Sequence, residues 1–361
     1  MQNRSDKSLF GIDINEYTQD VDFTFLATTI DFLYLRSSGS ATGRFRVDKK
    51  FLEFAKKARD LKIPVGAYHF GVPSADLTTA DSQCDDFINI LQEGFGEKDY
   101  GDLFPVLDVE TPTDNSISTS TLINWIERFR KRFEKKTRRR LMLYTGVFFV
   151  EMYNNFFIPD QGYPLKNMIL WIAHYTAIAG NAPIPPDVGG WTSWRIWQYS
   201  ESALVGGVGN PVDANWGPDS IDLLTQPRNV TGLTVNRKGN VLNVSWKKNT
   251  DTDLLGYNIF ANNYWIGTVD ADDTNFSINI NQLPFTVNGP IKISIEAFDR
   301  DGETSKFRRE PRRGGCKQEM GHRDRSGAHW KCSCMDLECH SGGKHEGTGQ
   351  QDQGGTERRI T

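Results

Sequence analysis

The sequence has little cysteine in its main part, no long apolar run and no excess of positive charge. Cys84 is the only cysteine before Cys316, which excludes a disulfide framework from most of the chain. No apolar stretch approaches the roughly 20 residues that cross a bilayer, so we expect no membrane insertion. Lys and Arg total 42 against 46 Asp and Glu, and this balance gives no support for a nucleic-acid partner.

The chain is long enough for two domains, since it has 361 residues of which 38% are hydrophobic and 12% aromatic. Cys84 aligns with Phe87, Ile88 and Leu91 at helical spacing, which predicts a buried packing thiol rather than a nucleophile.

Short apolar runs alternate with amphipathic stretches from residue 10 to about 145, the pattern of parallel strands joined by crossover helices. After residue 168 the strands follow one another without helical periodicity between them. We therefore predict an α/β fold, an irregular barrel of TIM type whose last three strands have lost their helices. The eight predicted strands are 11–14, 32–35, 64–68, 104–109, 141–144, 168–172, 195–199 and 211–215.

Two of the predicted helices have clear apolar faces, one over 51–61 and one over 123–133. The Ser/Thr-rich segment 116–121 offers N-caps for the second of them. Its basic end, from Arg130 to Arg140, suits a helix C-terminus, and we interpret these charges as a solvated face.

A second module is predicted over 227–305, where strands alternate apolar and polar residues as in an antiparallel sandwich with Trp246 and Tyr257 in its core. The sequence Leu242-Asn-Val-Ser-Trp246, the pair Gly256-Tyr257 and the stretch Ala297-Phe-Asp-Arg-Asp-Gly302 resemble the fibronectin type III pattern. The last strand of that pattern is missing after Ser305, which predicts an unpaired sheet edge.

The remaining segment, 306–361, is polar and has too little apolar surface to fold alone, so we expect a disordered tail or the product of a shifted reading frame. A zinc site is conceivable there, but the spacing of the cysteines and histidines matches no strong metal template. We therefore expect no metal or cofactor. The cysteines and histidines considered for that zinc site are Cys332, Cys334, Cys339, His340, His322, His329 and His345.

Two carboxylates, Asp108 and Glu110, stand two residues apart at the end of the apolar run that begins at Phe104. In a strand such residues project from the same face. An acid and a charge stabiliser sharing one site are what cleavage of a glycosidic bond requires. Their backbone separation of about 6.5 to 7 Å leaves open whether such a reaction retains or inverts the anomeric configuration.

Polar residues end nearly every predicted strand, where an α/β barrel has its active face. Because a closed barrel makes its first and eighth strands neighbours, Asp13 and Asp213 are expected to join Asp108 and Glu110. Crowded carboxyl groups cannot all ionise, so we expect a raised pKa at Glu110, the proton donor, beside an ionised Asp108. The other strand-end residues, candidates for substrate binding, are Arg36, Tyr68, His69, Tyr144, Trp171 and Gln198.

Residues 8 to 225 resemble glycoside hydrolase family 25 muramidases in six ordered motifs: Gly11-Ile-Asp-Ile-Asn15, Tyr34-Leu-Arg-Ser-Ser38, Gly66-Ala-Tyr-His-Phe70, Leu107-Asp-Val-Glu110, Ile196-Trp-Gln-Tyr-Ser200 and Val212-Asp-Ala-Asn215. The resemblance implies a barrel of eight strands and five helices that cleaves the β-1,4 bond between N-acetylmuramic acid and N-acetylglucosamine. It also implies Glu110 as acid, Asp108 as stabiliser of the intermediate, and a substrate acetamido group as internal nucleophile.

Three alternatives remain open. A related chitinase has further acids two and five residues before its Asp-x-Glu, where this chain has Val106 and Leu103. A catalytically silent wall-binding barrel has no need of Glu110. A structural protein led by the second module leaves the acid-lined barrel unexplained.

The expected partner of this monomer is the glycan strand of peptidoglycan, at the bacterial cell wall. The residues from Met1 to Ser8 contain no hydrophobic signal segment, so we expect synthesis in the cytoplasm and release by a holin-like or other non-signal route.

Overall fold

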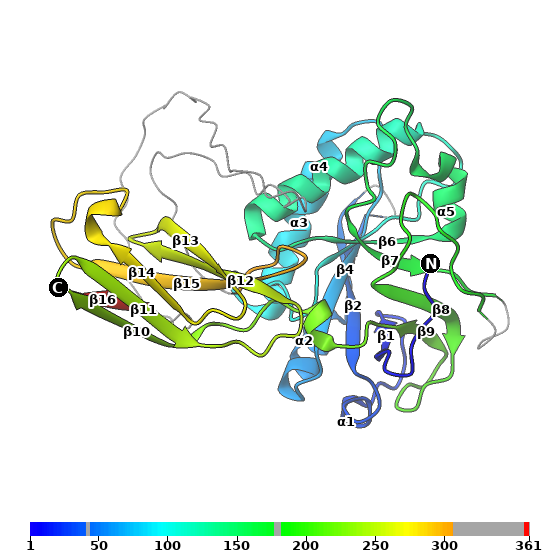
Figure 1. Ribbon diagram of the computed structural model, residues 1–361. Helices are drawn as coiled ribbons and strands as arrows, with labels where there is room; N and C mark the ends of the chain where they lie inside the picture. Colours follow the sequence, from blue (N-terminus) through cyan, green and yellow to red (C-terminus); the bar gives the residue numbers. More distant parts are fainter. Residues whose placement is uncertain (41–43, 177–181, 306–356, 361) are drawn as a thin grey trace.

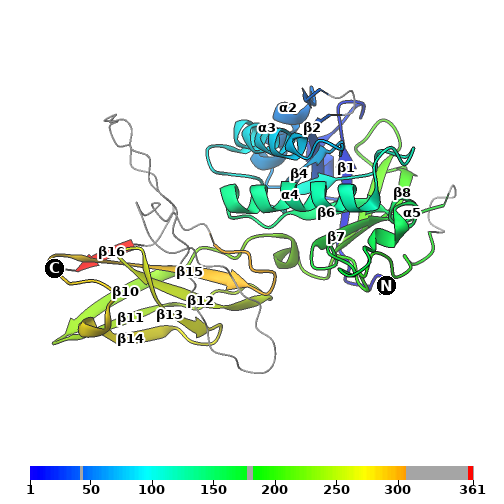
Figure 2. The same ribbon diagram turned by 90° about the horizontal axis from the view of Figure 1, so that it is seen from above.

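The computed structural model describes residues 1–40, 44–176, 182–305 and 357–360. Figure 1 shows a mixed α/β unit followed by an all-β unit beside it, and the view from above in Figure 2 separates the same two bodies. The cysteines and histidines of the tail, considered above as zinc ligands, and nearly all of the tail lie outside the described residues.

The first unit is a closed barrel of eight strands, as predicted. β1 pairs with both β2 and β9, which closes the sheet, and a short strand β3 (Arg46–Val47) extends the edge of β2. The last barrel strand is antiparallel to both of its neighbours, because the short link after β8 leaves no room for a crossover. The barrel strands are β1 (Phe10–Ile14), β2 (Phe32–Gly39), β4 (Val65–Phe70), β5 (Val106–Asp108), β6 (Met142–Gly146), β7 (Ile169–Ala173), β8 (Ile196–Ala203) and β9 (Val212–Trp216).

The helices are confined to the first part of the barrel, up to the connection between β6 and β7. Ser118 caps α4, since its hydroxyl accepts a hydrogen bond from the Thr121 amide at 3.1 Å. Cys84 is fully buried in α3, as predicted, and burial raises the pKa of its thiol to about 12. The helices are α1 (Phe23–Leu26), α2 (Phe51–Asp60), α3 (Thr78–Phe95), α4 (Thr119–Thr137) and α5 (Val147–Met152), with short 3-10 turns η1 (Asn154–Phe156) and η2 (Ile221–Leu224).

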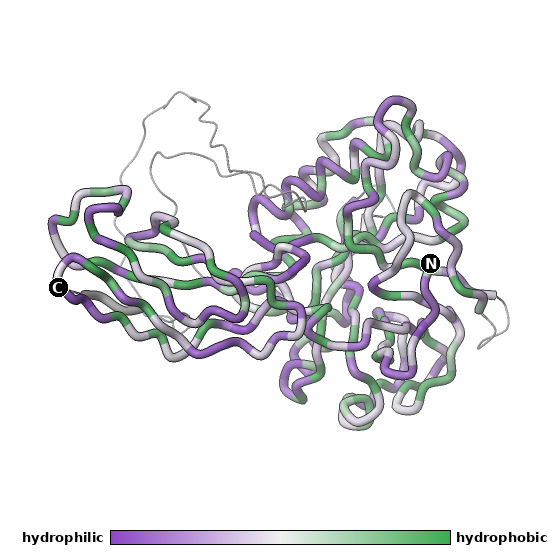
Figure 3. The backbone as a smooth tube through the Cα atoms, viewed as in Figure 1, coloured by the Kyte–Doolittle hydropathy of each residue, from purple (hydrophilic) through white to green (hydrophobic). Residues whose placement is uncertain are grey.

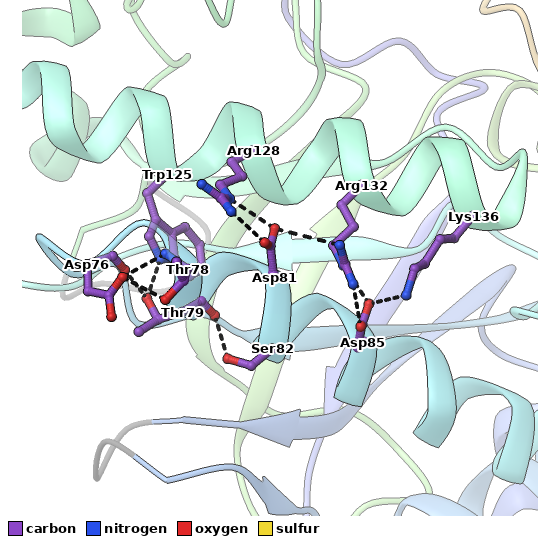
Figure 4. Close-up of polar contacts among 10 residues, drawn as sticks. All are labelled: Asp76, Thr78, Thr79, Asp81, Ser82, Asp85, Trp125, Arg128, Arg132 and Lys136. Carbon is purple, nitrogen blue, oxygen red and sulfur yellow. Dashed lines mark hydrogen bonds and ion pairs between the residues drawn. The ribbon is translucent and has the colours of Figure 1, made fainter. Parts of the chain in front are cut away.

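Helices α3 and α4 are joined by a row of ion pairs, drawn in Figure 4. Arg128 contacts Asp81 at 2.6 Å, and Asp85 accepts from both Arg132 and Lys136 at 2.6 Å. Much of the positive charge at the end of α4 is therefore matched by acids on α3.

The second unit contains two antiparallel sheets around one core. Trp246 and Tyr257 are both buried in that core, as predicted, with ring centroids 5.2 Å apart. Figure 3 shows hydrophobic and hydrophilic residues alternating along these strands. One sheet holds β10 (Thr231–Lys238), β11 (Val241–Lys247) and β14 (Asn275–Asn279); the other holds β13 (Tyr264–Asp270), β12 (Leu254–Ala261), β15 (Ile291–Asp299) and β16 (Glu357–Ile360), with the turn η3 (Ile280–Gln282) after β14.

The edge of β15 is not left unpaired, which corrects one expectation. β16 comes from the far end of the tail and pairs antiparallel with it, from Ile291 opposite Ile360 to Ser294 opposite Glu357. The expectation of a wholly disordered tail is therefore wrong for 357–360.

The two units meet at the amino end of the barrel strands, and the contact corrects the interpretation of the basic end of α4 as a solvated face at Arg139, while Lys131, Lys136 and Arg138 remain exposed. Arg139 is only 2% exposed. Its guanidinium pairs with the buried Glu303 of the second unit at 3.0 Å and donates to the carbonyls of Gly101 and Leu103. A buried guanidinium needs such partners, and here they come from both units.

Candidate active site

Four carboxyl groups meet at the carboxyl end of the barrel. Asp13 in β1 lies opposite Asp213 in β9, and Asp108 ends β5 with Glu110 just beyond it. The charges of Asp13, Asp213 and Glu110 all affect the pKa of Asp108. The charge of Asp13 also affects the pKa of Glu110 and that of Asp213. The structure therefore brings together the four acids that the sequence pointed to.

Asp13 is held by two buried amides. Its Oδ2 accepts from Asn215 Nδ2 at 2.8 Å and from Gln198 Nε2 at 3.1 Å. These donors favour the ionised form of Asp13, but burial is the larger effect and raises the pKa of its carboxyl group. Trp171 Nε1 donates to Asn215 at 2.9 Å and Tyr144 Oη to Gln198 at 2.8 Å, so both amides are oriented in turn.

Asp213 is paired with Asp13 through a shared hydrogen bond. Burial, then the charge of Asp13, raises the pKa of Asp213 to about 9. Asp213 is therefore protonated at neutral pH and donates its proton to Asp13, which accepts all of its hydrogen bonds.

Asp108 is strongly desolvated. Burial, then the charge of Glu110, raises the pKa of Asp108 well above its usual value, while the charge of Arg36 opposes that shift. Its Oδ1 is buried without a hydrogen-bond partner. Asp108 is only 5% exposed, which gives desolvation its large effect.

Glu110 is the accessible member of the four. Its side chain is exposed, in contrast to Asp13 and Asp108. Partial desolvation, then the charges of Asp13 and Glu201, raises the pKa of its carboxyl group. An exposed carboxyl group with a raised pKa suits a general acid.

Arg36 and Tyr68 face the acids from β2 and β4. The positive charge of Arg36 lowers the pKa of Asp108, and the charges of Asp13 and Asp108 help to raise that of Tyr68. Arg36 is itself held by Asp48 at 2.9 Å and Glu16 at 3.4 Å. It is oriented by protein acids rather than free in solvent.

Four residues predicted to contact substrate are buried in the free protein: Tyr68, His69, Trp171 and Gln198. His69 is 0% exposed and points away from the acids, because neighbouring strand residues alternate and Tyr68 faces inward. It contacts Ser38 and Gln83 and lies near the rings of Phe87 and Phe129. Burial lowers its pKa to about 4.

Trp171 and Gln198 are 1% and 3% exposed, so they support the site from inside the barrel. The Trp171 indole is packed between Tyr34 and Tyr144, with ring centroids 4.7 and 5.0 Å away. In the free protein both contact the acid site through Asp13, Gln198 directly and Trp171 by way of Asn215.

The sequence pattern places Asn215 with Asp213 at the end of the last barrel strand but gives it no specific role, and it does not single out Glu201. Asn215 follows the alternation of β9 from Asp213, a signal that places both side chains on the same face. Glu201 gives no such signal, because an irregularity in β8 turns it toward the site.

No group of three or more His, Cys, Asp or Glu side chains within the described ranges has the geometry of a metal site. None of the helices described is long and apolar enough to cross a membrane.

Comparison with known proteins agrees with this site. Residues 12–208 match the family model for glycosyl hydrolases family 25. The crystal structure of the Clostridium perfringens spore cortex lytic enzyme SleM is 55% identical in sequence, with a TM-score of 0.82 over 85% of this chain and 98% of that one.

Two curated relatives are more distant. Lysozyme M1 of Streptomyces globisporus is 29% identical over 210 residues, which span 57% of this chain and 66% of that protein. The N,O-diacetylmuramidase of Chalaropsis sp. is 28% identical over 155 residues, 42% of this chain and 67% of that protein. The family model covers the strands that carry Asp13, Asp108 and Glu110, and more than half of the chain. The chain belongs to glycosyl hydrolases family 25.

Proposed function

We propose that this protein is a peptidoglycan hydrolase that acts as a monomer on bacterial cell walls. It cleaves the β-1,4 bond between N-acetylmuramic acid and N-acetylglucosamine, with Glu110 as general acid. The observation that carries the proposal is the contrast among the acids: Glu110 is exposed and the pKa of its carboxyl group is raised, while Asp13 and Asp108 are buried.

Asp108 has the neighbouring role in this mechanism. Its Oδ1 lacks a partner, and the N–H of a substrate acetamido group would supply one. That contact would orient the acetamido oxygen toward the anomeric carbon as an internal nucleophile. The carboxylate form of Asp108 then stabilises the positive charge that develops at the anomeric carbon, and that positive charge in turn favours the ionised form of Asp108.

Asp13 and Asp213 prepare the site for this chemistry. Their shared proton and the amides of Asn215 and Gln198 keep Asp13 in one orientation. Its negative charge acts on Glu110 and favours the protonated form that a proton donor needs.

We propose the domain boundaries 8–225 for the catalytic barrel, 227–305 for a module of fibronectin type III type, and 306–361 for the tail. Two antiparallel sheets around Trp246 and Tyr257 support the second assignment. Arg139 and Glu303 join the two units through a buried pair, so truncation after residue 226 would disturb the barrel as well as remove the module.

The experiment is the release of reducing ends from purified peptidoglycan by the wild type, Glu110→Gln and a control, Glu151→Gln. Glu151 lies on α5 and is exposed, so the control removes the same charge away from the four acids. We expect Glu110→Gln to lose roughly 100- to 10,000-fold in kcat while still sedimenting with cell walls. Equal activity in Glu110→Gln and the wild type would remove Glu110 from the mechanism.

The natural substrate is tested by comparing two wall preparations. The similarity to a spore cortex lytic enzyme makes cortex peptidoglycan the first choice and vegetative wall the comparison. Sedimentation with either wall but no release of reducing ends by the wild type would replace the enzyme with a wall-binding protein.

A further inference from the structure

A fifth carboxyl group, Glu201, lies beside the four acids on β8. Ser200 pairs with Ala214 and Ala203 pairs with Val212, so Glu201 and Ser202 together lie opposite the single residue Asp213. Two residues opposite one form a β-bulge, which turns a strand locally and redirects its side chains. An earlier irregularity, between Gln198 and Ser200, changes the alternation along β8, so Glu201 lies on the face of Asp213 and not on the opposite face, where regular alternation from Gln198 would have put it.

Glu201 has a defined partner there. Tyr175 Oη donates a hydrogen bond to Glu201 Oε2 at 3.0 Å. Tyr175 follows β7, whose neighbour in the sheet is β8, so the bond connects the carboxyl ends of two adjacent strands. Burial, then this bond, raises the pKa of Tyr175, and Asp213 and Glu110 add to the effect. The phenol is therefore bonded to Glu201 and close enough to Asp213 and Glu110 to be affected by their charges.

We propose that Glu201 is a positioning residue for the glycosidase reaction: it fixes the Tyr175 hydroxyl at the rim of the site and holds a negative charge beside Glu110. This inference rests on the proposed function. Because the Tyr175 proton is committed to Glu201, the phenol oxygen offers substrate an acceptor. The exposed charge of Glu201 favours the protonated general acid.

Several other polar and charged groups also surround the acids. Within the described structure, Glu201 forms no ion pair with any of them. Those groups stay unchanged when Glu201 is replaced, so its own contribution can be isolated. From the neighbouring elements they are Asp13 on β1, Arg36 on β2, Tyr68 on β4, Asp108 on β5, Tyr144 on β6 and Asp213 on β9.

The test compares Glu201→Gln, Glu201→Asp and Tyr175→Phe with Glu151→Gln. Loss of the negative charge lowers the pKa of Glu110, so the alkaline limb of the kcat/KM profile of Glu201→Gln moves to lower pH by roughly half a unit. Because the Glu201 carboxylate is exposed, high salt screens its charge and makes the shift of the limb smaller. Glu201→Asp keeps the negative charge, so the alkaline limb of its profile stays at the wild-type pH. Tyr175→Phe keeps the limb and raises KM more than it lowers kcat.

An unshifted limb in Glu201→Gln overturns the inference, and so does an equal shift in Glu151→Gln, which would reflect net charge alone. A second measurement is independent of activity: a carbon-13 NMR titration of Glu110 in the free protein, where Glu201→Gln lowers the pKa. If the wild type releases no reducing ends, the proposed function fails, while the titration still decides whether Glu201 acts on Glu110. Melting temperatures confirm that each variant is folded.

Discussion

The two ends of the barrel both gather acidic side chains, but they differ in how those charges are matched. At the amino end, Glu303 pairs with Arg139 and Asp301 with Arg195, with N–O distances of 3.0 and 2.8 Å. At the carboxyl end, Asp13, Asp108 and Asp213 face one another, and burial raises the pKa of each. At the amino end burial also raises the pKa of Glu303, but Arg139 opposes that shift, whereas at the carboxyl end the neighbouring carboxyl groups add to it for Asp108 and Asp213.

The comparison shows that burial alone does not determine what an acid does. Glu303 is 0% exposed and Asp108 is 5% exposed, yet only Glu303 has a guanidinium beside it. The unmatched acids of the site therefore lower the stability of the folded protein, as expected where protonation is part of the chemistry. The joint between the units offsets part of this cost.

The largest effect is expected from breaking the matched end. Arg139→Met leaves Glu303 buried without its cation and removes the donors to Gly101 and Leu103, so we expect a loss of about 3 to 5 kcal/mol in the free energy of unfolding. Urea unfolding measures it, with Arg128→Met as the control, because Arg128 is 42% exposed in its pair with Asp81. A loss below 1 kcal/mol, as expected for the control, would show that the joint is not stabilised by this pair.

The unmatched acids predict a pH dependence of stability. The pKa of Asp213 is raised to about 9 and that of Asp299, a buried acid of the second unit, to about 8. An acid whose pKa is raised by folding stabilises the folded state at pH values below the pKa it has in the unfolded chain. This contribution is lost as the pH rises through its pKa in the folded state. Stability should therefore fall between about pH 4 and pH 9.

Asparagine substitutions separate the two acids. Asp299→Asn and Asp213→Asn should each be more stable than the wild type at pH 9, by on the order of 1 kcal/mol. Only Asp213→Asn should lose activity, since Asp213 shares its proton with Asp13. Thermal unfolding at pH 5 and pH 9, with reducing-end release, measures both. If neither variant gains stability at pH 9, the two acids are ionised in the folded protein.

The barrel and its acids could be predicted because each strand is an apolar run that ends in a polar residue. The alternation of side chains along β4 also predicts the orientation of His69: because Tyr68 points into the barrel, its neighbour in the strand points outward. Trp171 and Gln198 were harder, because a residue at a strand end can either reach the surface or fill the barrel. Their depth depends on Tyr34, Tyr144 and Asn215, which come from other strands.

The joint and the bulge could not be predicted from local patterns. Arg139 stands in a run of arginines that has the composition of a solvated face, and its partner Glu303 is 164 residues away. Glu201 is placed by a register irregularity between β8 and β9, which no period in the sequence reveals. Both features arise from pairing between distant segments.

The smallest expected effect also comes from the joint, where one pair is only half protected. Arg138 is 43% exposed and contacts the buried Glu296 at 3.0 Å. Solvent screens the guanidinium, so Arg138→Gln should lose less than about 1 kcal/mol in the free energy of unfolding, and the difference should shrink in 1 M salt. The same urea experiment at low and high salt measures it. A loss as large as that of Arg139→Met would mean that Glu296 depends on this cation for its burial, and that the matched end relies on both arginines rather than on Arg139 alone.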